Sequence, residues 1–305
     1  MLYAHRKKRR RQPDGKNQRR QKPPDPVLTW LACAICVVMS LGRWGLGRWG
    51  LYPPGAEWDG KYQALLTPVF VHIGYWHIAG NFFWLWILGG QLEKAIGSLR
   101  WLAFFLTAAT VSSAIQLWTS GIRCIGASGV VYAIFGFMWA ARNHFDGFKN
   151  WIIKPTIIYF VAWLFLCLAS TFLNLRQFAN AAHFSGMFWG IIVADIFVVR
   201  RKAILSKIAS VAMIAASVIP LYWCPWSVIW VSKQADNAYS KGDYAEAIKF
   251  YNRSLELGQD PGLVYASLAA AYWQIGDRSK YEEAVKKADE LIKKPQEQSP
   301  ESGAK

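Results

Sequence analysis

The sequence predicts an all-α membrane protein with six membrane-spanning helices, a seventh apolar helix and a small soluble region of helical repeats. Two observations support this fold class. The chain of 305 residues is 53% hydrophobic and only 18% charged, and its apolar residues gather in blocks near the roughly 20 residues that a bilayer requires. From residue 232 onward the pattern changes to amphipathic helices that carry both charge signs. The chain therefore divides into a membrane part and a soluble part.

The first 26 residues form a basic, proline-containing segment with a run of Lys and Arg from Arg6 to Arg11. We expect a disordered cytoplasmic tail, because this composition buries little apolar surface and basic residues stay on the inner side of a membrane. The formal charge of +16 resides entirely in the membrane part, since residues 232–305 hold eleven basic and twelve acidic side chains. The lipid bilayer, and not nucleic acid, is thus the expected partner of this charge.

Seven apolar segments follow the tail. A core of six spans is expected within residues 27–202 and a seventh span within residues 203–231, where Pro220 and Pro225 also allow a re-entrant helix. Basic residues follow the second, fourth and sixth segments, which predicts a cytoplasmic N-terminus and places the end of a seventh span outside. The segments lie at about 27–42, 69–90, 101–120, 127–145, 155–174, 179–199 and 207–231.

Residues 232–294 show a helical period of 34 residues, in which Ala235 and Ala238 recur as Ala269 and Tyr272. This spacing resembles tetratricopeptide repeats, each a helix–turn–helix unit. Two units are few, so we expect them to pack on each other, on a dimer mate or on a protein partner that they bind. The tail of residues 295–305 is expected to be disordered.

Ser128 is the first candidate catalytic residue. It opens the fourth apolar segment between small residues, in the stretch Gly126-Ala-Ser128-Gly129. Taken alone, such a stretch serves close helix packing more often than chemistry. His183 opens the sixth segment, where a histidine can simply reach lipid headgroups or water. His77 and Asn81 open the second segment on one helix face, and they could be a structural hydrogen-bonding pair.

The topology brings these four groups to one level of the membrane. His183 follows Ser128 by 55 residues, which hold one descending span, an inner loop and a returning span. Nucleophile, base and two polar donors can therefore meet near the outer surface. Gly186 and Gly190 share the face of His183, and close packing against Gly129 would bring the imidazole to the hydroxyl. Tyr132 lies one turn below Ser128, where it could stack on His183 or serve ordinary packing.

The order and spacing of these residues resemble the rhomboid family of intramembrane serine proteases. The resemblance covers roughly residues 58–200. It implies a Ser128–His183 dyad without an aspartate, an oxyanion site made of the Ser128 N–H, His77 and Asn81, and support of His183 by Tyr132. It also implies that the substrates are transmembrane helices cut near their outer end. The matching motifs are His77-x-x-x-Asn81, Gly89-x-x-x-Glu93-x-x-x-Gly97, Gly126-Ala-Ser128-Gly129 with Tyr132, and Ala182-His183-x-x-Gly186-x-x-x-Gly190.

One departure from the family lies in the loop before the second span, where Gln63-Ala64 stand in place of a frequent Trp-Arg pair. The attached repeats resemble an arrangement seen in Gram-positive bacteria, which implies a bacterial plasma membrane. We expect no metal and no cofactor, since no carboxylate or cysteine accompanies His72 and His77 on a shared face. The alternative functions are a catalytically silent rhomboid-like chaperone or adaptor, and a transporter. The transporter would need inverted repeats and charged helix centres, which the sequence lacks.

Overall fold

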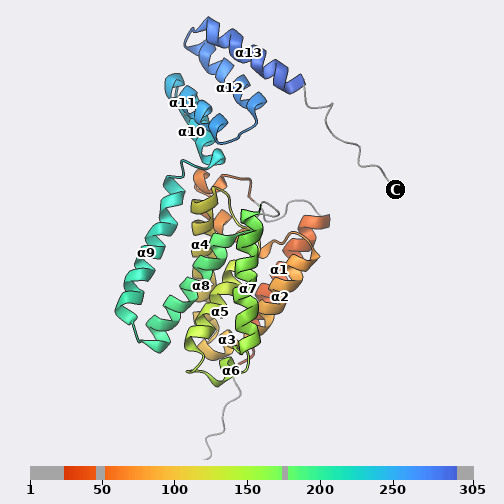
Figure 1. Ribbon diagram of the computed structural model, residues 1–305, viewed down its shortest axis with the longest axis vertical. Helices are drawn as coiled ribbons and strands as arrows, with labels where there is room; N and C mark the ends of the chain where they lie inside the picture. Colours follow the sequence, from red (N-terminus) through yellow and green to blue (C-terminus); the bar gives the residue numbers. More distant parts are fainter. Residues whose placement is uncertain (1–23, 46–51, 174–177, 294–305) are drawn as a thin grey trace, which may run out of the picture.

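The computed structural model describes residues 24–45, 52–173 and 178–293, and in these residues the regular elements are all helical (Figure 1). The expected tails at 1–26 and 295–305 lie outside the described residues, apart from residues 24–26. The membrane part contains α1 (Val27–Gly45), α2 (Tyr75–Trp84), α3 (Gly90–Ile96), α4 (Ser98–Ser120), α5 (Ser128–Ala141), α6 (Asp146–Lys149), α7 (Lys154–Phe172), α8 (Asn180–Ala194) and α9 (Ala203–Tyr222).

Four of these helices are long and apolar enough to cross a membrane: α4, α7, α9, and α8 together with the π turn Asp195–Val199. Two shorter apolar helices, Val27–Leu41 within α1 and Ser128–Ala141, accompany them. Helices α2 and α3 join through the π turn η4 (Leu85–Gly89) into one continuous helical run. The helices thus account for each of the seven apolar segments.

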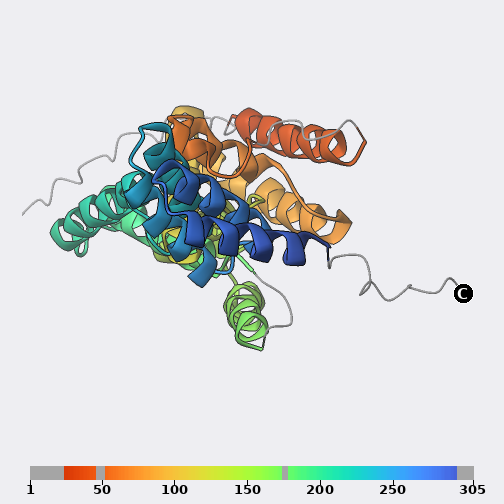
Figure 2. The same ribbon diagram turned by 90° about the horizontal axis from the view of Figure 1, so that it is seen from above.

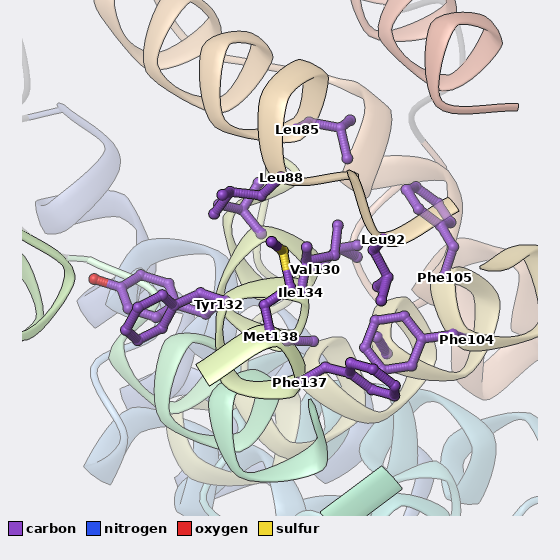
Figure 3. Close-up of a cluster of buried hydrophobic side chains, with 14 of the residues drawn as sticks. Leu85, Leu88, Leu92, Phe104, Phe105, Val130, Tyr132, Ile134, Phe137 and Met138 are labelled. Carbon is purple, nitrogen blue, oxygen red and sulfur yellow. The ribbon is translucent and has the colours of Figure 1, made fainter. Parts of the chain in front are cut away.

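Helix α5 is the centre of the bundle. Its residues are buried from Gly129 to Met138, whereas α7 and α9 expose most of their apolar side chains at the periphery (Figures 1 and 2). Figure 3 shows Ile134 and Met138 of α5 among side chains of the α2–α3 run and α4. In water, burying a large apolar side chain stabilises a fold by about 1.5–3 kcal/mol. Between helices in a membrane this contribution is absent, because lipid tails are as apolar as the side chains, and helices associate through close packing instead. Close fit around α5 therefore fixes its position.

The second expected segment begins later than hydropathy suggested. Residues 69–74 are not part of the α2 helix, which starts at Tyr75. They end a loop with three short 3₁₀ turns, η1 (Ala56–Asp59), η2 (Tyr62–Leu65) and η3 (Thr67–Phe70), and the last turn includes residues 69 and 70. The segment is apolar because Val69 and Val71 are buried; both belong to the loop of residues 52–74, named the outer loop after its expected side of the membrane. Hydropathy alone cannot separate a buried loop from a buried helix.

The expected seventh segment contains one helix and the start of another. Helix α9 ends at Tyr222, and Trp223 has an extended backbone. Cys224 precedes Pro225, and a residue before proline disfavours helical geometry. A new helix begins at Val228 and continues across the expected boundary between residues 231 and 232. Pro220 lies inside α9, and its carbonyl accepts a hydrogen bond from Trp58 Nε1 at 2.7 Å.

The region expected to be soluble consists of two helix pairs, α10 (Val228–Ser240) with α11 (Tyr244–Glu256) and α12 (Pro261–Gln274) with α13 (Arg278–Lys293). Asp243 and Asp260 cap the starts of α11 and α12 by accepting backbone N–H bonds, which satisfies donors that a helix start leaves free. Ala247, Leu268 and Ala284 belong to its separate apolar core. Corresponding helices start 33 and 34 residues apart, at Val228 and Pro261 and at Tyr244 and Arg278.

Residues 226–233, at the start of these helix pairs, contact the membrane part directly. Ser227 caps α10 and donates its hydroxyl to the Gly121 carbonyl at 2.7 Å, just after α4 ends. Lys233 forms an ion pair with Asp59 at 2.5 Å, and Trp226 Nε1 donates to the Trp118 carbonyl. The helix pairs therefore rest on the end of the bundle where the outer loop lies (Figure 1).

Candidate active site

Ser128 is the first residue of α5, and His183 lies in the first turn of α8. Their side chains meet: His183 Nε2 and Ser128 Oγ are 2.8 Å apart. His183 is only 4% exposed, so bulk water competes little for this hydrogen bond. A neutral imidazole that accepts the hydroxyl proton can act as a general base toward the serine oxygen.

The other ring nitrogen of His183 has no carboxylate behind it. His183 Nδ1 is buried and has no hydrogen-bond partner among the residues that the structure describes. Instead, the ring of Tyr132 stacks on the imidazole, with centroids 4.8 Å apart and planes at 28°. Tyr132 is itself fixed, because its hydroxyl donates to the Phe160 carbonyl at 3.0 Å. Within the described residues, the face of an aromatic ring and not a carboxylate thus packs against this imidazole.

Glycines let α5 and α8 approach until their backbones touch. A Cβ placed at Gly186 would lie 2.1 Å from the Gly129 carbonyl oxygen, and one at Gly190 would lie 1.9 Å from the Ala133 carbonyl oxygen. On α5, a Cβ at Gly136 would lie 2.2 Å from the Met187 carbonyl oxygen. Real Cβ atoms do not approach so closely, so each site requires glycine. This close contact sets the distance between Ser128 and His183.

The segment before Ser128 is held by the outer loop. Gly126 has φ of 102°, a conformation that favours glycine, and its N–H donates to the Pro68 carbonyl at 2.9 Å. The Ala127 N–H donates to His72 Nε2 at 3.2 Å. His72 is fully buried, and its Nδ1 pairs with Ser40 Oγ of α1 at 3.3 Å. His72 therefore links α1 and the outer loop to the residue preceding Ser128.

His77 lies directly against this segment. A Cβ built at Gly126 would fall 2.6 Å from His77 Cε1 and 2.7 Å from His77 Nε2, so the ring occupies the space that glycine leaves. Asn81 is buried one turn deeper, and its Nδ2 donates to the His77 carbonyl at 2.9 Å within the same helix. The structure thus places His77 beside the approach to Ser128, while the hydrogen bond described for Asn81 is local.

Sequence reasoning missed some contributors to this arrangement. The sequence draws attention to His72 only as a possible metal ligand, whereas in the structure its Nε2 accepts a hydrogen bond from the Ala127 N–H. Ser40 and Pro68 carried no signal in a single sequence, because their roles depend on loop geometry. In the described part of the chain, no group of three or more His, Cys, Asp or Glu side chains is arranged to hold a metal ion.

The part of the chain that contains Ser128 and His183 matches a known protein family. The model of the Rhomboid domain matches residues 59–200. The chain is 31% identical over 177 residues to rhomboid protease GlpG of Haemophilus influenzae, covering 88% of that protein and 54% of this chain. The chain belongs to the rhomboid family of intramembrane proteases. It is accordingly a multi-pass membrane protein.

Other rhomboid relatives are covered less completely. GlpG of Pectobacterium atrosepticum is 35% identical over 162 residues, which cover 53% of this chain and 58% of that protein. GlpG of Salmonella paratyphi A is 29% identical over 172 residues, which cover 55% of this chain and 62% of that protein. The rhomboid match ends at residue 200, before α9 begins at Ala203. The family match therefore does not extend to α9 and the soluble helices.

Proposed function

We propose that this protein is an intramembrane serine endopeptidase that hydrolyses peptide bonds in or near transmembrane helices, with Ser128 as nucleophile and His183 as base. The observation that carries the proposal is the 2.8 Å contact between His183 Nε2 and Ser128 Oγ at the adjoining ends of two apolar helices. A serine hydroxyl is a weak nucleophile unless a base adjoins it. A hydroxyl kept only for helix packing has no need of a buried imidazole.

The proposed reaction has two halves. Ser128 Oγ attacks the peptide carbonyl carbon while His183 Nε2 takes the hydroxyl proton. The C–N bond then breaks, and His183 returns this proton to the leaving amine, which leaves an acyl ester on Ser128. A water molecule next gives a proton to His183 and attacks the ester, and the proton passes back to Ser128 Oγ as the acid is released.

The negative oxygen of each intermediate needs hydrogen-bond donors. We propose the Ser128 backbone N–H, the His77 ring and the Asn81 amide for this role. Ser128 is the first residue of α5, and the backbone N–H groups of a helix start lack partners within the helix. His77 is well situated, because its ring lies against Gly126. Asn81 would need to turn from the His77 carbonyl toward the substrate.

Asn81→Ala should lower kcat by about 10²–10³-fold and leave KM nearly unchanged, the usual effect of losing one oxyanion donor. Asn252→Ala is a matched control, because Asn252 Nδ2 also donates to the carbonyl four residues earlier at 2.9 Å. The control should cleave like wild type. His77→Ala should likewise lower kcat. Unchanged turnover in both Asn81→Ala and His77→Ala would assign these residues a structural role only.

The substrates that we propose are single transmembrane helices of membrane proteins, cut near their outer end. Ser128 opens an apolar helix and lies beside the outer loop, at the end of the bundle that bears the soluble helices. A peptide bond must leave its helix before Ser128 can attack its carbonyl, and helices unwind most readily where water can satisfy the backbone. No cofactor is required for this chemistry.

Reconstitution tests the proposal against the catalytically silent alternative. The purified protein in liposomes, mixed with a model single-span substrate, should yield two fragments cut near the outer end of the span. A silent chaperone or adaptor would bind the same helix and leave it intact. Binding without fragments, under conditions in which the protein is folded, would therefore reject the protease.

We further propose that the protein lies in a bacterial plasma membrane with its N-terminus in the cytoplasm and α10–α13 outside. Helix α6, which ends at Lys149, and the connection into α9, which contains Arg200 and Lys202, lie at the end opposite the soluble helices, as inner basic residues should (Figure 1). The two helix pairs keep the spacing typical of tetratricopeptide repeats, so we propose that they bind a protein partner.

A cysteine at position 279 tests the orientation. Ser279 is exposed on α13, and all five native cysteines are buried, so background labelling should be low. In intact cells, Ser279→Cys should react with a membrane-impermeant maleimide, while Asn150→Cys, exposed at the opposite end, should react only after lysis. The reverse pattern would put α10–α13 in the cytoplasm.

A further inference from the structure

Arg123 lies in the short segment between α4 and α5, five residues before Ser128. Its side chain is mostly buried, with 11% exposed, and its guanidinium donates to three backbone carbonyls of the outer loop. Nη1 bonds the Ala64 carbonyl at 3.1 Å, and Nη2 bonds the carbonyls of Tyr52 and Pro53, both at 2.8 Å. One side chain thus supplies hydrogen bonds to two separate parts of the outer loop.

Glu57 balances the buried charge of Arg123. Its carboxylate is 2% exposed and lies 3.4 Å from Arg123 Nε, at ion-pair distance. Burial raises the pKa of the Glu57 carboxyl, and the positive charge of Arg123 opposes that shift. The Nη1 and Nη2 groups of Arg123 donate to carbonyls and not to Glu57. Glu57 therefore compensates the charge of Arg123 more than it accepts hydrogen bonds from it.

The same two segments are joined again nearer to Ser128. The Gly126 N–H donates to the Pro68 carbonyl at 2.9 Å, and the Ala127 N–H donates to His72 Nε2 at 3.2 Å. The loop before Ser128 is therefore attached to the outer loop at both of its ends. Arg123 holds the far end, and the two N–H groups hold the end next to Ser128.

We infer that Arg123 is a positioning residue for the proteolysis proposed above: by fixing the outer loop against the segment that precedes Ser128, it holds the serine and its backbone N–H in place. The inference rests on the proposed function. A displacement of about 1 Å at a reacting group can lower the rate by about 10²-fold. A residue that fixes the backbone five positions before Ser128 can therefore affect kcat. Glu57 supports Arg123 by balancing its charge.

The test compares Arg123→Lys, Arg123→Gln and Glu57→Gln with wild type in the full-length protein. Lysine keeps the charge but cannot bond three carbonyls in a planar fork. Arg253→Lys is the control, since Arg253 pairs with Glu256 on the exposed surface of α11. A fluorophosphonate probe gives both the fraction of enzyme that labels at long times and the rate constant of labelling, without requiring a transmembrane substrate.

Arg123→Lys should still label completely at long times, but with a rate constant lowered at least about tenfold, and kcat for a model substrate should fall while KM stays near wild type. Arg123→Gln should lose more, and Glu57→Gln less. Arg253→Lys should match wild type. A role confined to stability would instead reduce the fraction that labels and leave the rate constant unchanged, and that result would overturn the inference.

Hydrogen exchange separates this inference from the proposed function. The peptide of residues 121–128 should exchange faster in Arg123→Lys than in wild type, while peptides from the middle of α5 should not change. Equal exchange in residues 121–128 would overturn the bracing role even if cleavage were lost. If wild-type Ser128 failed to react with the probe, the proposed function would fail, and faster exchange would still support the brace.

Discussion

Ser128→Ala and His183→Ala should each lower kcat/KM for a model transmembrane substrate by at least about 10⁴-fold, because neither group can activate the reaction alone. The double variant should be no worse than either single variant, since the pair acts as one unit. Ser128→Ala and His183→Ala should each keep the melting temperature of wild type within a few degrees. The measurement is fragment formation in liposomes with variant proteins purified from a host free of other intramembrane proteases.

Ser210→Ala is the matched control for this experiment. Ser210 also lies in an apolar helix, α9, where its hydroxyl donates to the Lys207 carbonyl of the same helix at 2.8 Å. It should cleave like wild type. Cleavage that survived in pure Ser128→Ala would contradict the assignment of the nucleophile, and a double variant much slower than both single variants would contradict their action as a unit.

Gly190→Ala is expected to have the second largest effect. The added Cβ would lie 1.9 Å from the Ala133 carbonyl oxygen and 2.8 Å from the Phe137 backbone nitrogen. Both are backbone atoms, which cannot relieve the overlap by changing rotamer. Helices α5 and α8 must separate, which should destabilise the fold by about 3 kcal/mol, at the upper end of typical overpacking costs. The same separation draws His183 away from Ser128, so cleavage should fall at least about 10²-fold.

Gly80→Ala is the control for Gly190→Ala. Gly80 is also a helical glycine, but a Cβ there meets nothing within 4 Å. Alanine is the better helix former, so this variant should be as stable as wild type or slightly more stable. Thermal unfolding in detergent and cleavage in liposomes give both quantities. Equal losses in the two variants would contradict this explanation, because Gly80→Ala adds a Cβ that meets nothing and leaves the contact between α5 and α8 unchanged.

The family and the all-helical fold could be predicted from the sequence because their signals are local or periodic. Apolar blocks mark spans without knowledge of their neighbours. The meeting of Ser128 and His183 could also be anticipated, because topology alone returns the chain to the same depth after 55 residues. Glycines one and two turns after His183 similarly mark a contact face, and Gly186 and Gly190 do touch the backbone of α5.

The outer loop could not be predicted in the same way. Its 3₁₀ turns have no long period, and its apolar residues Val69 and Val71 read as the start of a helix. Nothing in the sequence distinguishes Arg123 from other charged residues in the connections. Its bonds to the carbonyls of Tyr52, Pro53 and Ala64 join residues 59 to 71 positions apart, and no spacing rule connects them. The C-terminal end of α9 likewise depends on local backbone geometry, since Trp223 is extended.

The most direct test of the Ser128–His183 pair is to locate the adduct of a fluorophosphonate probe by peptide mass spectrometry. This reagent phosphonylates a serine only when a neighbouring base has activated it. Wild type should carry a single adduct, on Ser128, and His183→Ala should carry none under the same exposure. An adduct on a different serine, or labelling of Ser128 that persists at the wild-type rate in His183→Ala, would contradict the dyad.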